Sequence, residues 1–105
     1  MILIEKLSDM IEEEMDDAEK YIRCAMNHKE SRPLLAEVFY KLSTEEMQHM
    51  SLLHDQVAKL IEEYRKEHGD PPADMKAIYE HLHSKHIAKA TAIKNMQMIY
   101  KAGAM

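Results

Sequence analysis

The 105-residue chain contains one cysteine, Cys24, and only two glycines and three prolines. A single cysteine excludes an internal disulfide, a cysteine-rich zinc knot and a CxxC redox pair. A β-rich fold needs many turns, and these glycines and prolines supply the turn-forming residues for about two. We therefore expect a single all-α domain spanning residues 1–105.

Long hydrophobic runs and an excess of positive charge are also absent. The opening Met-Ile-Leu-Ile run ends at Glu5, which makes it too short for a signal peptide or a membrane crossing. The chain has 14 Lys and Arg against 19 Asp and Glu, a formal net charge of −5. Neither a nucleic acid nor a membrane is therefore expected as a partner, and the expected location is cytoplasmic.

The few helix-breaking residues cluster in two places, which divide the chain into three parts. Pro33 suits the first turn of a helix, where its missing N–H has no partner to lose. In the second cluster, Gly69 suits a left-handed helix end, Asp70 a cap and Pro71 the start of the next helix. At 1.5 Å per residue the middle helix would be about 54 Å long and would form a long antiparallel hairpin with the first. The predicted helices cover residues 3–28, 33–68 and 71–102.

Helical periodicity shows which side chains share the apolar side of each helix. Glu14 interrupts the apolar stripe of the first helix, and Glu46 and His49 interrupt that of the middle helix. The acids expected on solvated outer faces are Glu12, Glu13, Glu19, Glu62 and Glu63. The first stripe consists of Leu3, Leu7, Met10, Ile11, Glu14, Ala18, Tyr21 and Ala25. The methionines expected to fill the core are Met10, Met50, Met75 and Met96.

Three ionisable residues on apolar stripes need compensation, because an unpaired buried charge costs several kcal/mol. A buried Glu–His hydrogen bond, or a stripe position open to solvent, would explain any one of them. Glu14 and Glu46 are equally far along the chain from the first turn, so an antiparallel hairpin brings them to one level. Glu46-x-x-His49 aims two ligands at one ion, and carboxylates with one imidazole suit iron or manganese better than structural zinc.

The same residues resemble the first half of a rubrerythrin-type protein of the ferritin-like superfamily. The resemblance covers residues 8–60 and implies one helix-A glutamate ligand, one bridging glutamate and one terminal histidine at a di-iron site. In that order these would be Glu14, Glu46 and His49. The family's second set of ligands and its rubredoxin-like cysteine pairs are missing here, and the alanine lies one position later than usual. The matching motifs are Glu14-x-x-x-Ala18-x-x-Tyr21 and Glu45-Glu46-x-x-His49.

The third helix does not complete this ligand set within one chain. Counted from the second turn, the predicted ligands of the middle helix are level with Lys94 and Thr91, which are not metal ligands. His86 is level with His54 instead. His86 is either a core histidine or an additional ligand.

Other polar residues near the stripes remain candidates of a different kind. Asp17, one turn from Glu14, either lies on a solvated edge or contributes to the metal site by orienting a ligand. Glu80-x-x-His83 has ligand spacing but lies on the flank of its helix. His81 is also expected on the flank.

A two-fold axis would complete the ligand set. Two hairpins facing each other form a ferritin-like four-helix bundle in which each copy contributes Glu14, Glu46 and His49. The four carboxylates balance the charge of two Fe²⁺ ions, and small ferritin-like proteins of the encapsulated-ferritin type assemble in this way. We therefore expect a homodimer or higher homo-oligomer with two Fe ions per dimer, for which Mn or Zn could substitute.

Three classes of function remain open from the sequence. The first is a di-iron oxidoreductase of ferroxidase or peroxidase type, which oxidises Fe(II) with O₂ or peroxide or reduces peroxide. The second is a metal-binding or storage protein without turnover. The third is a helical assembly module that kept the scaffold without activity. Metal content separates the third class from the others, and a turnover assay with Fe(II) and peroxide separates the first from the second.

Overall fold

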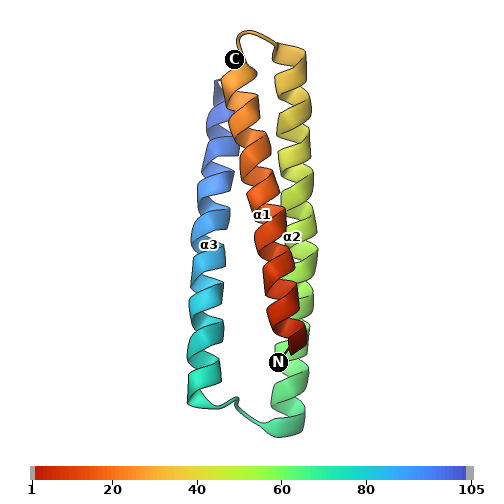
Figure 1. Cartoon of the computed structure of the whole chain (residues 1–105), viewed down its shortest axis with the longest axis vertical. Coiled ribbons are helices and arrows are strands. Elements are labelled where there is room, and N and C mark those ends of the chain that lie inside the picture. The colour runs from red at the N-terminus through yellow and green to blue at the C-terminus, as the bar shows by residue number, and fades with distance from the viewer. Residues whose placement is uncertain (1, 104–105) are drawn as a thin grey trace.

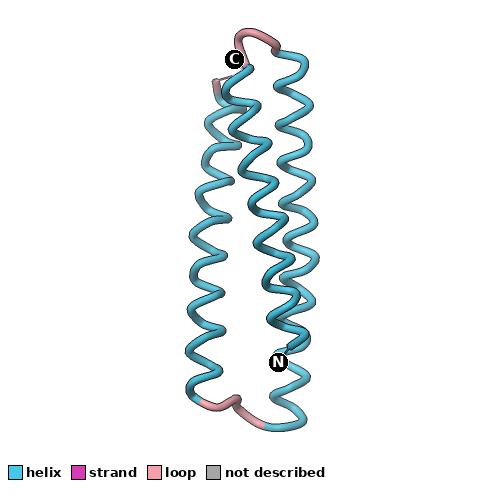
Figure 2. Tube along the Cα trace, in the orientation of Figure 1, coloured by secondary structure: helices cyan, strands magenta, loops and turns pink. Residues whose placement is uncertain are grey.

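The computed structural model describes residues 2–103 as three α-helices (Figure 1). They are α1 (Ile2–His28), α2 (Pro33–His68) and α3 (Ala73–Ala102). Within residues 2–103 there is no strand, and two short turns join the helices (Figure 2). The prediction of an all-α chain with three helices is confirmed. No helix in this part of the chain has an apolar stretch long enough to cross a membrane.

The first turn follows the prediction closely. Pro33 is the first residue of α2, and its fixed φ suits the helix start. The Arg32 N–H donates a hydrogen bond to the His28 carbonyl oxygen at 2.8 Å, which closes the end of α1. No side chain caps α2, so proline and this backbone hydrogen bond define the turn.

The second turn differs from the prediction at its far end. Gly69 has a φ of +77°, a conformation that favours glycine, and its N–H donates to the Arg65 carbonyl oxygen at 2.9 Å. The helix α3 begins at Ala73, not at Pro71, and Asp70 does not cap it. A residue that precedes proline is disfavoured in the helical region, so Pro72 keeps Pro71 out of the helix.

The three helices form a rod of 55 × 18 × 17 Å, whose length matches the 36 residues of α2. The helices α1 and α2 pack together as an antiparallel hairpin, and α3 returns along the hairpin and contacts α1 more than α2. Figure 1 shows that α2 extends past the N-terminus of α1 and that α3 is separated from α2 toward the second turn. Most of the core therefore lies along α1.

The core uses only part of the predicted stripe of α1: Ile11, Ala18 and Ala25 are buried as expected, together with residues beside the stripe. Two clusters join α1 to α3, one containing Ile11, Met15 and Ile93, the other containing Ile22 and Tyr100. The apolar surface of α1 is wider than one stripe, and α3 covers only the adjoining part of it. The fully buried residues of α1 are Ile4, Ser8, Ile11, Met15, Ala18, Ile22 and Ala25.

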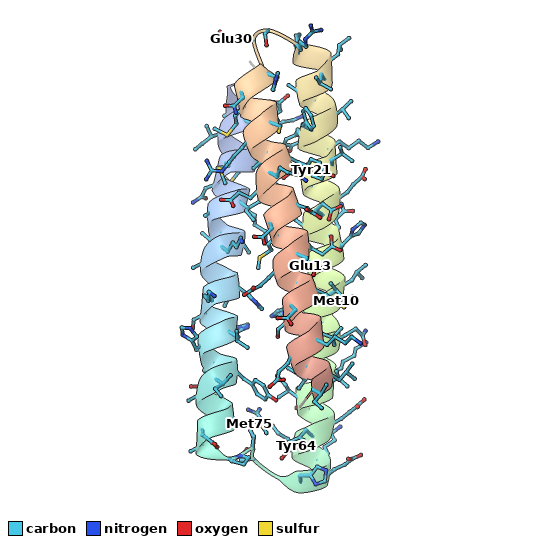
Figure 3. The ribbon with its side chains drawn as sticks, viewed as in Figure 1. Met10, Glu13, Tyr21, Glu30, Tyr64 and Met75 are labelled. Carbon is cyan, nitrogen blue, oxygen red and sulfur yellow. The ribbon has the colours of Figure 1, made fainter. Side chains whose placement is uncertain are left out.

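The rest of the predicted apolar stripe faces away from α3 and remains accessible. Leu3, Met10, Leu35 and Val38 keep between 42% and 54% of their surface exposed, so the prediction of Met10 as core filler is wrong. Met10 and Tyr21 lie on the side of α1 turned away from α3 (Figure 3). We call this surface the uncovered face. It consists of Leu3, Leu7, Met10 and Tyr21 of α1 with Leu35, Val38 and Leu42 of α2.

Candidate metal centre

The hairpin brings three of the predicted ligands together. One ligand atom from each of Glu14, Glu46 and His49 lies within 4.8 Å of the others. His49 Nδ1 is 3.5 Å from Glu14 Oε2 and 3.8 Å from Glu46 Oε1. The prediction that an antiparallel hairpin brings these residues to one level therefore agrees with the structure.

A buried hydrogen bond fixes the register that aligns these residues. The Ser43 hydroxyl, on the turn of α2 before Glu46, donates to the Ala18 carbonyl oxygen at 2.7 Å. Ala18 and Ser43 are both fully buried and small, which lets the two helix backbones approach closely. Gln97 Nε2 of α3 donates to the same hydroxyl at 2.9 Å. All three helices thus meet one turn away from the candidate ligands.

The candidate ligands lie on the uncovered face, not in the core as the sequence suggested. Their side chains are 28%, 19% and 54% exposed for Glu14, Glu46 and His49 respectively. The two carboxylates are therefore largely shielded within the groove between α1 and α2, whereas the imidazole is open to solvent. The three residues surround a position that is accessible from outside the chain.

The two carboxylates are too close for both to ionise freely. A hydrogen bond to Glu14, burial and the negative charge of Glu14 raise the pKa of Glu46 from 4.5 to about 7, and the positive charge of His49 opposes this. Glu14 Oε2 is buried without a hydrogen-bond partner. A carboxylate pair that holds a proton and leaves one oxygen unpaired has the character of a cation site.

Asp17 and His86 lie outside this group. The Asp17 side chain is 51% exposed and pairs with Lys20 at 3.9 Å, and its charge contributes to the raised pKa of Glu46. His86 is buried on α3, where its Nε2 is 3.6 Å from Glu12 Oε1. Neither residue provides an atom to the cluster of three.

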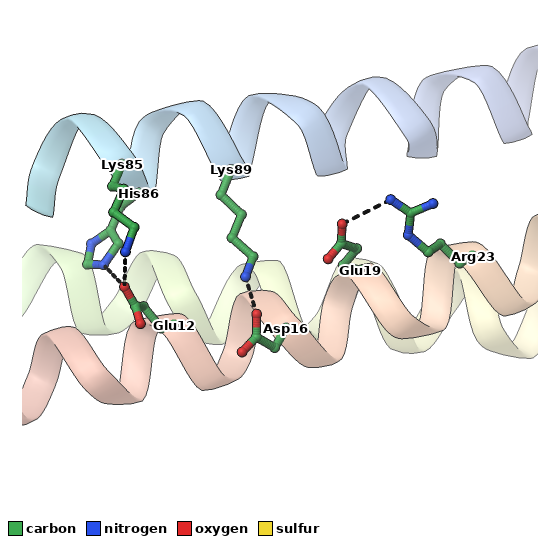
Figure 4. A network of polar contacts seen from close by, with 7 residues as sticks. All are labelled: Glu12, Asp16, Glu19, Arg23, Lys85, His86 and Lys89. Atoms are coloured by element: carbon green, nitrogen blue, oxygen red, sulfur yellow. Dashed lines mark hydrogen bonds and ion pairs between the residues drawn. The ribbon is translucent and has the colours of Figure 1, made fainter.

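Glu12 has a structural role that the sequence did not indicate. It was predicted on a solvated face, but it contacts Lys85 at 3.8 Å as well as His86 (Figure 4). One turn further along, Asp16 pairs with Lys89. Because α3 covers the neighbouring side of α1, these acids form ion pairs between the two helices. Burial lowers the pKa of His86, and the charge of Glu12 opposes this.

One polar contact between α2 and α3 was not predicted from the sequence. His83 was expected on the flank of its helix, yet its Nδ1 lies 3.4 Å from Nε2 of His54 on α2. Its position along the bundle axis could have predicted this contact. His86 was expected to be level with His54, and His83 is one helical turn from His86. The flank of α3 faces α2 at this height.

The chemistry of the three-residue group is defined by two carboxylates and one imidazole. Oxygen ligands with one nitrogen suit iron and manganese and are also compatible with zinc. Three protein ligands leave several coordination positions of such an ion for other ligands. No protein-family model, no curated protein and no solved structure matches this chain.

Proposed function

We propose that this chain is a ferritin-like protein that binds two iron or two manganese ions at a carboxylate-bridged site shared across a homodimer. The proposed activity is oxidation of Fe(II) by O₂ or reduction of peroxide. The observation that carries the proposal is the group of Glu14, Glu46 and His49 on the uncovered face. Their ligand types and level positions are those expected of half of a di-iron site.

The ligand count supports a shared site. Glu14, Glu46 and His49 are the one group of its kind within residues 2–103, and three ligands are half of the set that a two-ion centre uses. Two copies related by a two-fold axis would supply four carboxylates and two imidazoles. The four negative charges would balance two divalent ions, so the centre would be neutral when buried between the copies.

The surroundings of the site support the same assembly. Met10 of α1 and Val38 and Leu42 of α2 belong to the accessible apolar surface that surrounds the candidate ligands. Burying such a surface is favourable by about 25 cal/mol for each Å² removed from water. A second hairpin placed on it would form a four-helix bundle with α3 of each copy on the outside. The dimer would then also exclude water from the half-exposed His49.

Bound iron would supply the redox chemistry, and the residues of the chain would bind and orient it. Glu46 would bridge the ions, because its carboxylate is close to both Glu14 and His49 of the same chain. The raised pKa of Glu46 means that near neutral pH a proton occupies this position in the metal-free chain. Metal binding would displace that proton, so uptake should release protons and strengthen as pH rises.

The test is iron content measured against subunit mass in solution, followed by an Fe(II) oxidation assay with O₂ and with peroxide. We expect about one iron per chain, found only in the dimer, because each copy supplies half of the ligands. Glu13→Ala is the matched control for Glu46→Ala, since Glu13 is an exposed glutamate beside Glu14. Full loading of a monomer would refute the shared site.

The remaining outcomes separate the alternative functions. Metal bound by the dimer without Fe(II) oxidation or peroxide reduction would indicate a storage or carrier protein. A dimer that binds no metal at any concentration would indicate an assembly module, and the proposed activity would then be wrong.

A further inference from the structure

A second cluster of potential ligands lies on the opposite side of the molecule, between α2 and α3. A cavity of about 270 Å³ opens there, toward the second turn. Its apolar wall includes Ile4 of α1 and Val57 and Ile61 of α2. Its polar residues include three histidines and one acid, namely His54, His83, His86 and Glu80. None of these four belongs to the carboxylate group of the proposed function.

Two of the imidazoles face each other across the helices. His54 Nε2 lies 3.4 Å from His83 Nδ1, and the two rings are stacked at 27° with centroids 5.3 Å apart. At 3.4 Å the contact is long for a hydrogen bond between two ring nitrogens.

The spacing of these nitrogens matches that of two ligands on one ion. Nitrogens that each lie about 2.0–2.1 Å from a tetrahedral zinc ion are about 3.3–3.4 Å apart. His54 and His83 come from different helices, so an ion held by both would join α2 to α3. These two helices make the fewest contacts of any pair in the chain.

His86 provides the independent sign that a ligand is missing here. It follows His83 by one turn of α3 and shares the same cavity, and its side chain is only 8% exposed. Its Nε2 is buried without a hydrogen bond, and its nearest partner is Glu12 Oε1 at 3.6 Å, an ion pair that needs a protonated ring. Burial lowers the pKa of His86 and so disfavours that form, which leaves a buried nitrogen without a hydrogen bond beside two other imidazoles. The three imidazoles do not all converge within 4.8 Å, so His86 must rotate to join the other two.

We infer that His54 and His83 bind a divalent ion of the zinc type between α2 and α3, with His86 as the adjacent third ligand. Imidazole ligands suit zinc, nickel and copper, whereas the carboxylates of the first site suit iron and manganese. Glu80, three residues before His83, is the acid that lines the same cavity, and Arg65 and Lys76 are its cations. The ion would join α2 to α3 above the second turn.

The test is zinc affinity, measured by competition with a chromophoric chelator in the Glu46→Ala variant, which lacks the carboxylate site. Removing residues that only support a metal ligand already costs 10- to 100-fold in affinity, so His54→Ala and His83→Ala should each weaken binding by at least about tenfold. His81→Ala is the matched control, because His81 is exposed on the same helix and does not line the cavity. It should leave zinc affinity unchanged.

A second measurement needs no substitution. Nitrogen NMR of the imidazole rings of the unaltered chain should show His54 and His83 shifting when zinc is added, while His81 stays unchanged. Zinc affinity that His54→Ala and His83→Ala leave unchanged would overturn this site. So would a response confined to His49, and either result leaves the carboxylate site of the proposed function intact.

Discussion

The two faces of the α1–α2 hairpin are made by the same two helices but treat polar groups in opposite ways. On the face covered by α3, the Ser43 hydroxyl donates to Ala18 and accepts from Gln97, so its hydrogen-bonding groups are paired. On the uncovered face, Glu14 Oε2 is buried without a hydrogen bond, with His49 Nδ1 3.5 Å away, and the pKa of Glu46 is raised to about 7. The hydroxyl that sets the register is satisfied within the chain, whereas the candidate ligands are not.

The proposed function places binding on the uncovered face because of this difference. Native proteins pair nearly all of their buried polar atoms, so unpaired ones concentrate where something else supplies the partner. The uncovered face has a buried carboxylate oxygen without a hydrogen bond, Glu14 Oε2, and half-exposed apolar side chains. A cation would pair with the buried carboxylate oxygen, and another apolar surface would cover the apolar side chains. A second copy of the chain that carries metal would supply both.

The largest effect on metal content should come from removing the Glu46 carboxylate. Glu46→Ala should abolish binding of both metal ions, because a bridging carboxylate serves both and each copy supplies one. The measurement is iron per chain after purification without chelator. His49→Ala should weaken binding and leave the helices formed, since packing provides most of their stability. Iron retained in Glu46→Ala would show that the uncovered face does not bind the metal through this residue.

Substituting two methionines of α1 would compare the covered face with the uncovered face. Met15 is fully buried in the core and Met10 is 43% exposed on the uncovered face. Met15→Ala should lower the free energy of unfolding by about 2–5 kcal/mol through the cavity it leaves. Met10→Ala should leave the stability of the isolated chain nearly unchanged but weaken the dimer. Denaturant unfolding would measure the stability of the chain, and sedimentation across a dilution series would measure the dimer. Equal losses of unfolding free energy in the two variants would contradict the assignment of Met15 to the core and Met10 to the uncovered face.

The charge on the uncovered face should make the metal-free protein less stable as pH rises. The pKa of Glu46 is 4.5 when unfolded and about 7 when folded, so the folded chain holds a proton that the unfolded chain has released. The stabilisation from that proton is complete below pH 4.5 and is lost as pH rises through about 7. Thermal melting with chelator between these pH values should show the decline. Glu46→Gln should flatten it, whereas Glu13→Gln should not.

The smallest effect is expected from the ion pairs between α1 and α3. Asp16 and Lys89 pair at the surface, with side chains 64% and 34% exposed. Lys89→Ala should change the free energy of unfolding by about 0–1 kcal/mol, because exposed ion pairs contribute little. High salt should reduce the difference further. A loss as large as that of Met15→Ala would mean that charge, not packing, holds α3 in place.

The level of the candidate ligands could be predicted because it depends only on counting. In an antiparallel hairpin, residues equally far from the turn lie opposite each other, and Glu14 and Glu46 satisfy this condition. The three helices were predictable for a related reason, since the few glycines and prolines left only two places for turns. Both inferences rest on local chain geometry.

The position of α3 could not be predicted in the same way. The apolar surface of α1 is wide enough for two partners, and the sequence of α1 does not say which part its own third helix covers. Met10 was therefore assigned to the core, where it does not lie, and the ion pairs of Glu12 with α3 were not foreseen. The contact between His54 and His83 was missed for the same reason, because it depends on how α3 is rotated against α2.

The Ser43–Ala18 hydrogen bond has a consequence for how this protein tolerates change. Sliding α1 by one helical turn along α2 would move Glu14 by about 5.4 Å and separate the candidate ligands. The Ser43 hydroxyl opposes that sliding from within the helices, independently of the turn between His28 and Pro33. We therefore expect the spacing of the ligands to stay constant when the length or sequence of that turn is changed.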